Sequence, residues 1–186
     1  MSLLSYEELQ DLIRSGVINA DPANVNSASI DLTLDSVIMV EARHKLPAGW
    51  CSAPVDLMKK ESIKMDRVEL TDEGYILEPG QFILASSVEV FNLPNNISAE
   101  YKLKSTMARN GLEHLTAGWC DATWSGSKLT LEFKNMNQFH SLLIKPGMKC
   151  GQMIFFQHEP VPAHASYAVK GQYNGQQEVT AAKGLV

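Results

Sequence analysis

The sequence predicts a mainly β protein, an antiparallel β-barrel or jelly roll with a short N-terminal helix and few other helices. Two observations support this fold class. Hydrophobic and polar residues alternate with a period of two over much of the chain. The turn dipeptides Pro79-Gly80 and Pro146-Gly147 also mark the entrances of predicted strands. Many short strands separated by turns are typical of closed or double-sheet antiparallel folds. We expect all 186 residues to form one domain, 1–186.

The first predicted element is the N-terminal helix. Ser5 and Glu8 form an S-x-x-E pattern, the sequence signature of a capping box. Leu9, Leu12 and Ile13 follow at helical spacing. A helix is therefore expected to begin next to Ser5.

The alternating pattern begins where Ile30, Leu32 and Leu34 are interleaved with Asp31 and Thr33. Residues 43 to 70 show no regular pattern, and the chain contains no internal repeat. Further strands are predicted in the segments 76–91, 99–104, 129–133 and 142–156.

The C-terminal segment, from about residue 163 to 186, has no pattern that would build a core. It is polar and contains Gly171 and Gly175 together with Tyr167 and Tyr173. Two interpretations remain open: a frayed terminus, or a mobile lid that becomes ordered over a ligand.

Composition limits the classes of partner. The formal net charge of −5 argues against binding of a nucleic-acid polymer, which usually requires a basic face. A single small triphosphate stays compatible, because a few local cations can hold it. The first ten residues do not resemble a signal peptide, and no apolar run approaches the roughly 20 residues of a membrane span. We therefore expect a cytoplasmic protein without a membrane partner.

Cysteine and histidine placement predicts neither disulfides nor a zinc site. Cys51, Cys120 and Cys150 are widely separated, which is typical of reduced thiols. The five histidines show no metal-ligand spacing. Neither an H-x-E nor a C-x-x-C pattern occurs, so any deamination would not use the zinc chemistry of cytidine deaminases.

The segment 104–112 has the composition of an anion site. Ser105 is expected to cap a short helix over 106–110, which Gly111 would end in the left-handed conformation. Lys104 adds a cation at the helix start, and Arg109 lies one turn further along the same face. An ordinary capped turn with solvated charges is the alternative.

The segment 129–133 places a carboxylate in a strand. Glu132 and Thr130 alternate with Leu129, Leu131 and Phe133, so they share the face opposite to the hydrophobic residues. The alternative is a solvated charge on the wet face of a strand. The arginine of the preceding motif favours a functional role for Glu132, since this arginine could orient the carboxylate and partly neutralise its charge.

Taken together, the motifs resemble the dCTP deaminases of the dUTPase superfamily, and the likeness covers nearly the whole chain. Segments 25–34 (V-N-S-A-S-I-D-L-T-L) and 77–85 (L-E-P-G-Q-F-I-L-A) also look like that family. The five main motifs are K-S-T-x-A-R-x-G-L (104–112), T-A-G-W-C-D-x-x-W-x-G (116–126), L-T-L-E-F (129–133), K-P-G-M-K-C-G-Q (145–152) and Y-N-G-Q-Q (173–177).

The resemblance implies a distorted dUTPase-like jelly roll that assembles as a homotrimer with active sites at subunit interfaces. It implies hydrolytic deamination of dCTP to dUTP and ammonia without zinc, with Mg²⁺ arriving on the nucleotide triphosphate. The C-terminal segment would close over the nucleotide.

The resemblance also implies catalytic roles. Glu132 matches the general base that takes a proton from the water attacking C4 of cytosine, a role typically worth about 10²–10⁴ in rate. Arg109 matches the residue that holds this glutamate and the water. The Ala117 backbone would confine that water, and Ser105 belongs to the catalytic and phosphate-binding run with Lys104 and Thr106.

Further substrate contacts follow from the same likeness. Asp121 matches the sugar-contacting aspartate, although an aspartate before a turn is most often turn chemistry. Thr130 shares the face of the proposed base. Base and phosphate contacts from later strands and the lid would come from Gln152, Tyr167, Lys170 and Gln176.

Three departures from the family pattern are visible. Lys104 stands where arginine is common, which keeps the charge but loses bidentate phosphate contact. Ala122-Thr123 replaces a usual Pro-Gly, and the run 124–132 is one residue longer than common. Lys170 and Gln172 compete for the position of the lid lysine.

Several functions remain open. The leading one is dCTP deamination to dUTP; the alternatives are a bifunctional enzyme giving dUMP, a plain dUTPase, and a catalytically silent, nucleotide-sensing trimer. The T-A-G-W-C-D form favours the bifunctional members. Inhibition by dTTP and preference for 5-substituted dCTP are not decided by the sequence.

Overall fold

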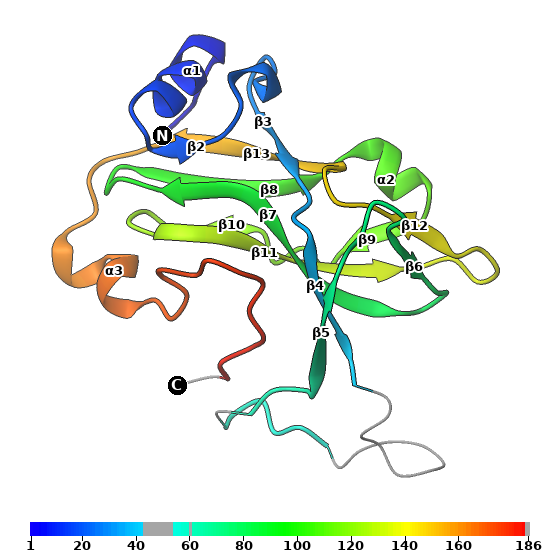
Figure 1. The fold of residues 1–186 in the computed structure, drawn as a ribbon. Coiled ribbons are helices and arrows are strands. Elements are labelled where there is room, and N and C mark those ends of the chain that lie inside the picture. The colour runs from blue at the N-terminus through cyan, green and yellow to red at the C-terminus, as the bar shows by residue number, and fades with distance from the viewer. Residues whose placement is uncertain (43–53, 60, 185–186) are drawn as a thin grey trace.

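The computed structural model describes residues 1–42, 54–59 and 61–184 (Figure 1). The helices are α1 (Tyr6–Arg14), α2 (Ser105–Arg109) and α3 (Tyr167–Lys170), with 3-10 turns η1 (Pro22–Asn24) and η3 (Ala163–Ala165). The strands are β1 (Ser2–Leu3), β2 (Ile18–Asn19), β3 (Ile30–Thr33), β4 (Val37–Glu41), β5 (Met65–Glu69), β6 (Tyr75–Leu77), β7 (Phe82–Asn92), β8 (Ile97–Leu103), β9 (Leu112–His114), β10 (Trp119–Cys120), β11 (Ser125–Asn135), β12 (Leu142–Ile144) and β13 (Lys149–Gln157).

The described strands form two larger antiparallel sheets and one small one. The first sheet has the order β1-β13-β8-β10, with β3 also paired to β13. The second has the order β5-β4-β7-β11-β9, with β2 also paired to β7. β12 and β6 pair separately. The predicted class, a mainly β antiparallel fold with few helices, is confirmed.

Local sequence signals locate several elements correctly. Helix α1 begins after Ser5, whose backbone N–H donates to Glu8 Oε2 at 2.8 Å, so the predicted capping box is formed. The long alternating segments each divide at their Pro-Gly turn. Gly80 and Gly147 adopt φ of 76° and 80°, which a side chain would disfavour. As a result β6 and β7 are separate strands, and so are β12 and β13.

Strand β5 lies where the sequence shows no regular pattern. β5 lies in the segment 43–70 and pairs with β4, Val37 opposite Glu69 and Glu41 opposite Met65. Its residues are mostly half-buried or exposed, so the hydrophobic pattern is weak and long-range pairing defines the strand. Cys120 and Cys150 are free and buried; Cys51 lies outside the described residues.

The main core lies between the two larger sheets, and Phe91, Phe133 and Phe155 are its largest fully buried side chains. A second, small cluster joins Val37 and Leu84 to Val179 of the C-terminal segment. No described helix is long and apolar enough to cross a membrane.

The C-terminal segment folds back beneath β11 (Figure 1). The N–H of Gly175 donates to Ser125 O at 3.0 Å, and the N–H of Lys128 donates to Gln176 O at 2.7 Å. The segment therefore pairs with the backbone of β11 near the start of this strand. Its predicted mobility as a lid stays a prediction.

Candidate functional site

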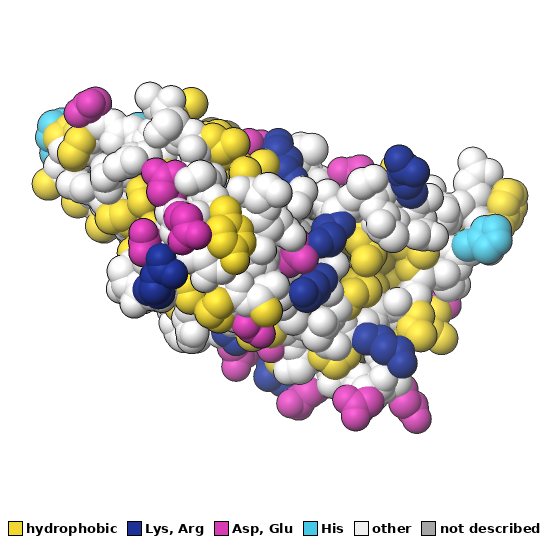
Figure 2. Space-filling model, turned by 90° about the horizontal axis from the view of Figure 1, so that it is seen from above, with side chains coloured by type: hydrophobic (Ala, Val, Ile, Leu, Met, Phe, Trp, Pro, Cys, Tyr) yellow, Lys and Arg dark blue, Asp and Glu magenta, His cyan; other side chains and the backbone are white. Residues whose placement is uncertain are grey.

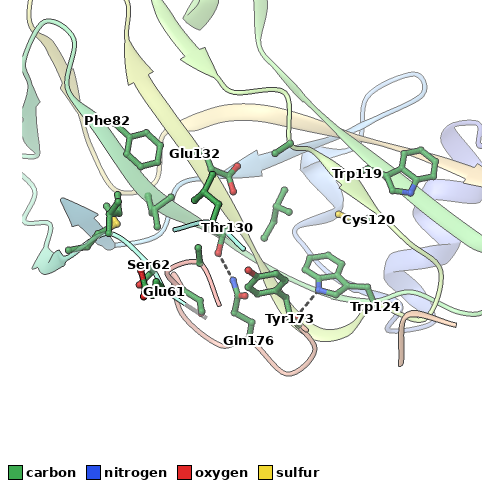
Figure 3. Close-up of a pocket in the computed structure, with 18 of the residues that line it drawn as sticks. Glu61, Ser62, Phe82, Trp119, Cys120, Trp124, Thr130, Glu132, Tyr173 and Gln176 are labelled. Carbon is green, nitrogen blue, oxygen red and sulfur yellow. Dashed lines mark hydrogen bonds between the residues drawn. The ribbon is translucent and has the colours of Figure 1, made fainter. Parts of the chain in front are cut away.

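A pocket of about 520 Å³ opens beside β10 and β11. Figure 3 shows Glu132 and Thr130 on its strand wall, with Gln176 approaching from the C-terminal segment. Six of the residues predicted to form the site line this pocket. They are Ala117, Asp121, Thr130, Glu132, Tyr167 and Gln176.

Strand periodicity explains how Glu132 reaches the pocket. Leu131 and Phe133 are fully buried in the core, whereas the Glu132 side chain keeps 26% of its surface exposed. Thr130 lies two residues earlier on the same face and accepts a hydrogen bond from Gln176 Nε2. The shared face expected from the sequence is confirmed.

The turn that follows the Thr116–Asp121 motif is tied to the C-terminal segment. The indole N–H of Trp124 donates to Tyr173 O at 3.0 Å, and the N–H of Ala168 donates to Thr123 Oγ1 at 2.9 Å. The first bond, drawn in Figure 3, joins two residues that line the pocket, so the tail borders the pocket there.

Two non-glycine residues of the motif 116–126 lie in the left-handed region of backbone space. Thr116 has φ of 59° and Thr123 has φ of 72°. A β-branched residue rarely adopts such a φ, and residues of this kind often store strain at functional sites. The left-handed conformation of Thr123 therefore places strain in the turn beside the pocket.

Asp121 lies at the pocket mouth. Its Oδ1 accepts a hydrogen bond from Trp119 Nε1 at 2.9 Å, which fixes one carboxylate oxygen. A second pocket of about 290 Å³ shares Asp121 and Tyr167 with the first and is also lined by Lys170. The predicted lid lysine therefore lies near the site without lining the main pocket.

The remaining predicted residues lie elsewhere in the protomer. None of them lines the main pocket, and Arg109 makes no ion pair with Glu132. Ser105, Thr106 and Arg109 of α2 are exposed. The other two are Lys104 and Gln152.

Lys104 is held by a buried carboxylate. Its Nζ lies 2.7 Å from Oδ1 of Asp31, whose side chain is 7% exposed, and Asn26 Nδ2 donates to the same oxygen at 2.8 Å. Gln152 lies opposite Asp31 in the sheet and accepts from Ser29 Oγ at 3.1 Å. These contacts form a polar network beside α2.

The helix start differs from the prediction by one residue. Lys104 is the N-cap of α2 and Ser105 is its first helical residue, so the expected Ser105 cap is wrong. Directly after β8, the backbone N–H of Lys104 donates to Cys150 O of β13 at 3.2 Å, and this anchors the helix one residue earlier. Gly111 has φ of 83°, as expected for the residue that ends the helix.

Sequence reasoning missed His114. Its ring is 4% exposed, and its Nε2 lies 3.3 Å from Oε2 of Glu132. β9 pairs with β11, which brings the histidine next to the carboxylate. Spacing along the chain does not reveal such a contact, because it depends on which strands pair.

Burial controls the ionisation of two neighbours. It raises the pKa of the Tyr101 hydroxyl and of the Cys120 thiol, and the nearby Glu132 charge adds to both shifts. Both groups are therefore neutral at ordinary pH. In the part of the chain that the structure describes, no group of three or more His, Cys, Asp or Glu side chains could hold a metal ion.

Comparison with known proteins identifies the class. Residues 3–158 match the model of a family described as dCTP deaminase-like. The chain belongs to this dCTP deaminase-like family.

Its relatives make the assignment more specific. The chain is 35% identical over 192 residues to a "dCTP deaminase, dUMP-forming" of Thermobifida fusca, covering 99% of this chain and 93% of the relative. It is 38% identical over 177 residues to a protein of the same description from Methanosphaerula palustris, covering 93% and 90%.

A solved structure supports the fold alone. The 2'-deoxycytidine 5'-triphosphate deaminase of Agrobacterium tumefaciens aligns with a TM-score of 0.62 at 20% identity. The alignment covers 82% of this chain but only 47% of that one, so the chain spans about half its length. The predicted dUTPase-like type of fold is consistent with this neighbour and with the family.

Proposed function

We propose that the protein deaminates dCTP and then hydrolyses the resulting dUTP to dUMP and pyrophosphate. The motifs alone favour deamination to dUTP, with the bifunctional reaction as an alternative. The relatives are described as dUMP-forming, which favours the bifunctional reaction.

The observation on which the proposal depends is the position of Glu132. Its partly exposed side chain lines the pocket formed by the T-A-G-W-C-D and L-T-L-E-F motifs. A pyrimidine ring placed there would bring C4 within reach of a water beside the carboxylate. Glu132 would take a proton from this water as its oxygen bonds to C4, and would return the proton to the amino group, which leaves as ammonia.

Phosphate hydrolysis would follow on the same nucleotide. A second water attacks the α-phosphorus, and pyrophosphate leaves from the bond between the α- and β-phosphates. We propose that Mg²⁺ bound to the triphosphate neutralises part of its charge, because such ions stabilise charge on phosphoryl oxygens.

The charges of one protomer support a site shared between subunits. The described pocket lining contains Glu61, Asp121 and Glu132 but no lysine or arginine. A triphosphate needs cations close to its oxygens. Arg109 is exposed on α2 and has no carboxylate partner among the described residues. We propose a homotrimer in which α2 of one subunit completes the pocket of the next.

One assay tests the proposal. Purified protein is given dCTP with Mg²⁺, and ammonia and pyrophosphate are measured in the same sample; dUTP is a second substrate. We expect both products from dCTP and pyrophosphate from dUTP.

The other outcomes separate the alternatives. Ammonia without pyrophosphate means a deaminase that stops at dUTP. Pyrophosphate from dUTP without ammonia from dCTP means a plain dUTPase. Nucleotide binding without either product means a nucleotide-sensing trimer.

A further inference from the structure

His114 and Glu132 approach each other in a buried position behind the pocket. The Nε2–Oε2 distance is 3.3 Å, but the alignment does not reach that of a hydrogen bond. Both atoms are buried and neither has another hydrogen-bond partner in the structure. Buried polar atoms are nearly always bonded, and a pair left unbonded side by side requires an explanation.

The histidine ring is fixed by aromatic neighbours. Tyr101 of β8 packs against it with ring centroids 4.4 Å apart, and Phe133 meets it edge-on at 5.9 Å. The pairing of His114 with Phe133 in the sheet fixes the backbone as well. A ring held in this way can restrain a flexible carboxylate, whereas the reverse is not expected.

The chemistry of the contact fixes where the proton lies. An ionised carboxylate only accepts hydrogen bonds, so Nε2 must carry a hydrogen when it faces Oε2. The other titratable groups close to Glu132 are the Tyr101 hydroxyl and the Cys120 thiol, and burial keeps both protonated. Both could donate a hydrogen bond, but His114 is the neighbour whose donor atom lies 3.3 Å from this oxygen.

We propose that His114 is a positioning residue for Glu132: its Nε2–H holds Oε2 and leaves the exposed part of the carboxylate to face the attacked base. The inference rests on the proposed function, since it assumes that Glu132 is the base. In ligand-free structures catalytic hydrogen bonds are often long or poorly aligned and tighten when substrate binds. The 3.3 Å approach fits this behaviour.

Two substitutions separate donation from packing. His114→Gln keeps an N–H donor at a similar reach, and His114→Phe keeps a ring between Tyr101 and Phe133 but has no donor. We expect the Phe variant to lose about 100-fold in kcat for deamination, the typical cost of misplacing a reacting group by about 1 Å. The kcat of the Gln variant should stay within about tenfold of that of the parent protein, because the hydrogen bond to the ionised Glu132 carboxylate is retained.

The pH profile provides a readout that a purely structural role would not change. Loss of a donor disfavours the ionised carboxylate, so the acid limb of the kcat profile should move to higher pH in the Phe variant only. The dCTP affinity should change little in either variant. His140→Gln, at an exposed position, is the matched control and should behave like the parent protein.

A measurement on the unsubstituted protein keeps the test independent of folding. The ¹⁵N chemical shifts of the histidine rings, assigned with His114→Gln, should show His114 protonated at Nε2 throughout the active pH range. A ring with a bare Nε2, or a folded Phe variant with the parent kcat and pH profile while Glu132→Gln is inactive, would overturn the inference. Full deamination by Glu132→Gln would instead refute the role of Glu132 and the proposed function with it.

Discussion

The pocket beside β11 and the surface around α2 differ in the properties that decide how a side chain can act on a nucleotide. The pocket is partly enclosed, contains three acidic side chains and has no cation among its described lining residues. The α2 surface exposes Ser105, Thr106 and Arg109. Figure 2 shows the upper face of the molecule, where Lys and Arg side chains surround a hydrophobic strip instead of forming one continuous patch.

Under the proposed function, one protomer separates the base from the residues that would bind phosphate. The carboxylate must be ionised to accept a proton, and a nearby cation favours that form. A triphosphate also needs cations close to its oxygens. Contact between α2 of one subunit and the pocket of another would meet both requirements.

The largest expected effect is the loss of deamination when Glu132 in the pocket is replaced. Glu132→Gln should abolish deamination while the affinity for dCTP stays within about tenfold, because the amide keeps size and hydrogen bonding but cannot accept the proton from water. Ammonia release and isothermal calorimetry measure the two quantities. Substantial turnover by the folded variant would remove Glu132 from the role of base.

Mixing two inactive variants tests whether Glu132 and Arg109 of one site come from different subunits. Glu132→Gln and Arg109→Ala proteins are unfolded, mixed in equal amounts and refolded. If each site takes Glu132 from one subunit and Arg109 from the next, about a quarter of the sites in randomly mixed trimers contain both parent residues. Each variant refolded alone is the control. No recovery in mixed trimers, verified by light scattering, would place both residues in the same subunit's site.

The sequence located the pocket residues better than the α2 contacts, and the reason is physical. The faces of Glu132 and Thr130 follow from strand periodicity, which is local. The ion pair of Lys104 with Asp31 and the approach of His114 to Glu132 depend on which strands pair, and spacing along the chain does not encode this. A contact between Arg109 and Glu132 was inferred from proximity of motifs, yet one protomer keeps them apart.

The next prediction separates the two cations near α2. Arg109→Lys should lower kcat by about 100-fold, because an ammonium on a flexible stem cannot hold a carboxylate and a water in fixed geometry. Lys104→Arg should be tolerated, since Asp31 already holds the side chain and either cation satisfies it. Steady-state kinetics of both variants measure the effect. Equal losses in the two would contradict this division of roles.

Removal of the C-terminal segment should have a smaller effect. A chain ending before Tyr167 should still form the trimer but lose about tenfold or more in kcat, because closure over the site excludes water from the reacting atoms. Val179 is buried against Val37 and Leu84, so the melting temperature should fall modestly. Light scattering, thermal melts and the ammonia assay test this, and a truncated protein with full activity would show that the segment is not a lid.

The smallest expected effect concerns the strained turn between the pocket and the tail. Thr123→Gly relieves a left-handed conformation that costs roughly 1 kcal/mol or more. The same change removes the acceptor for the Ala168 N–H, a bond worth about 1 kcal/mol, and adds backbone freedom to the unfolded chain. The opposing effects should leave the melting temperature nearly unchanged. Protease should nevertheless cleave the tail faster, because the bond joining it to the turn is lost.

Thr123→Val is the matched control: it keeps the strain and loses the acceptor, so it should both lower the melting temperature and loosen the tail. If the glycine variant resists protease as well as the parent protein, the Thr123 hydroxyl does not hold the segment, and the contacts of Tyr173 and Gln176 with β11 are sufficient.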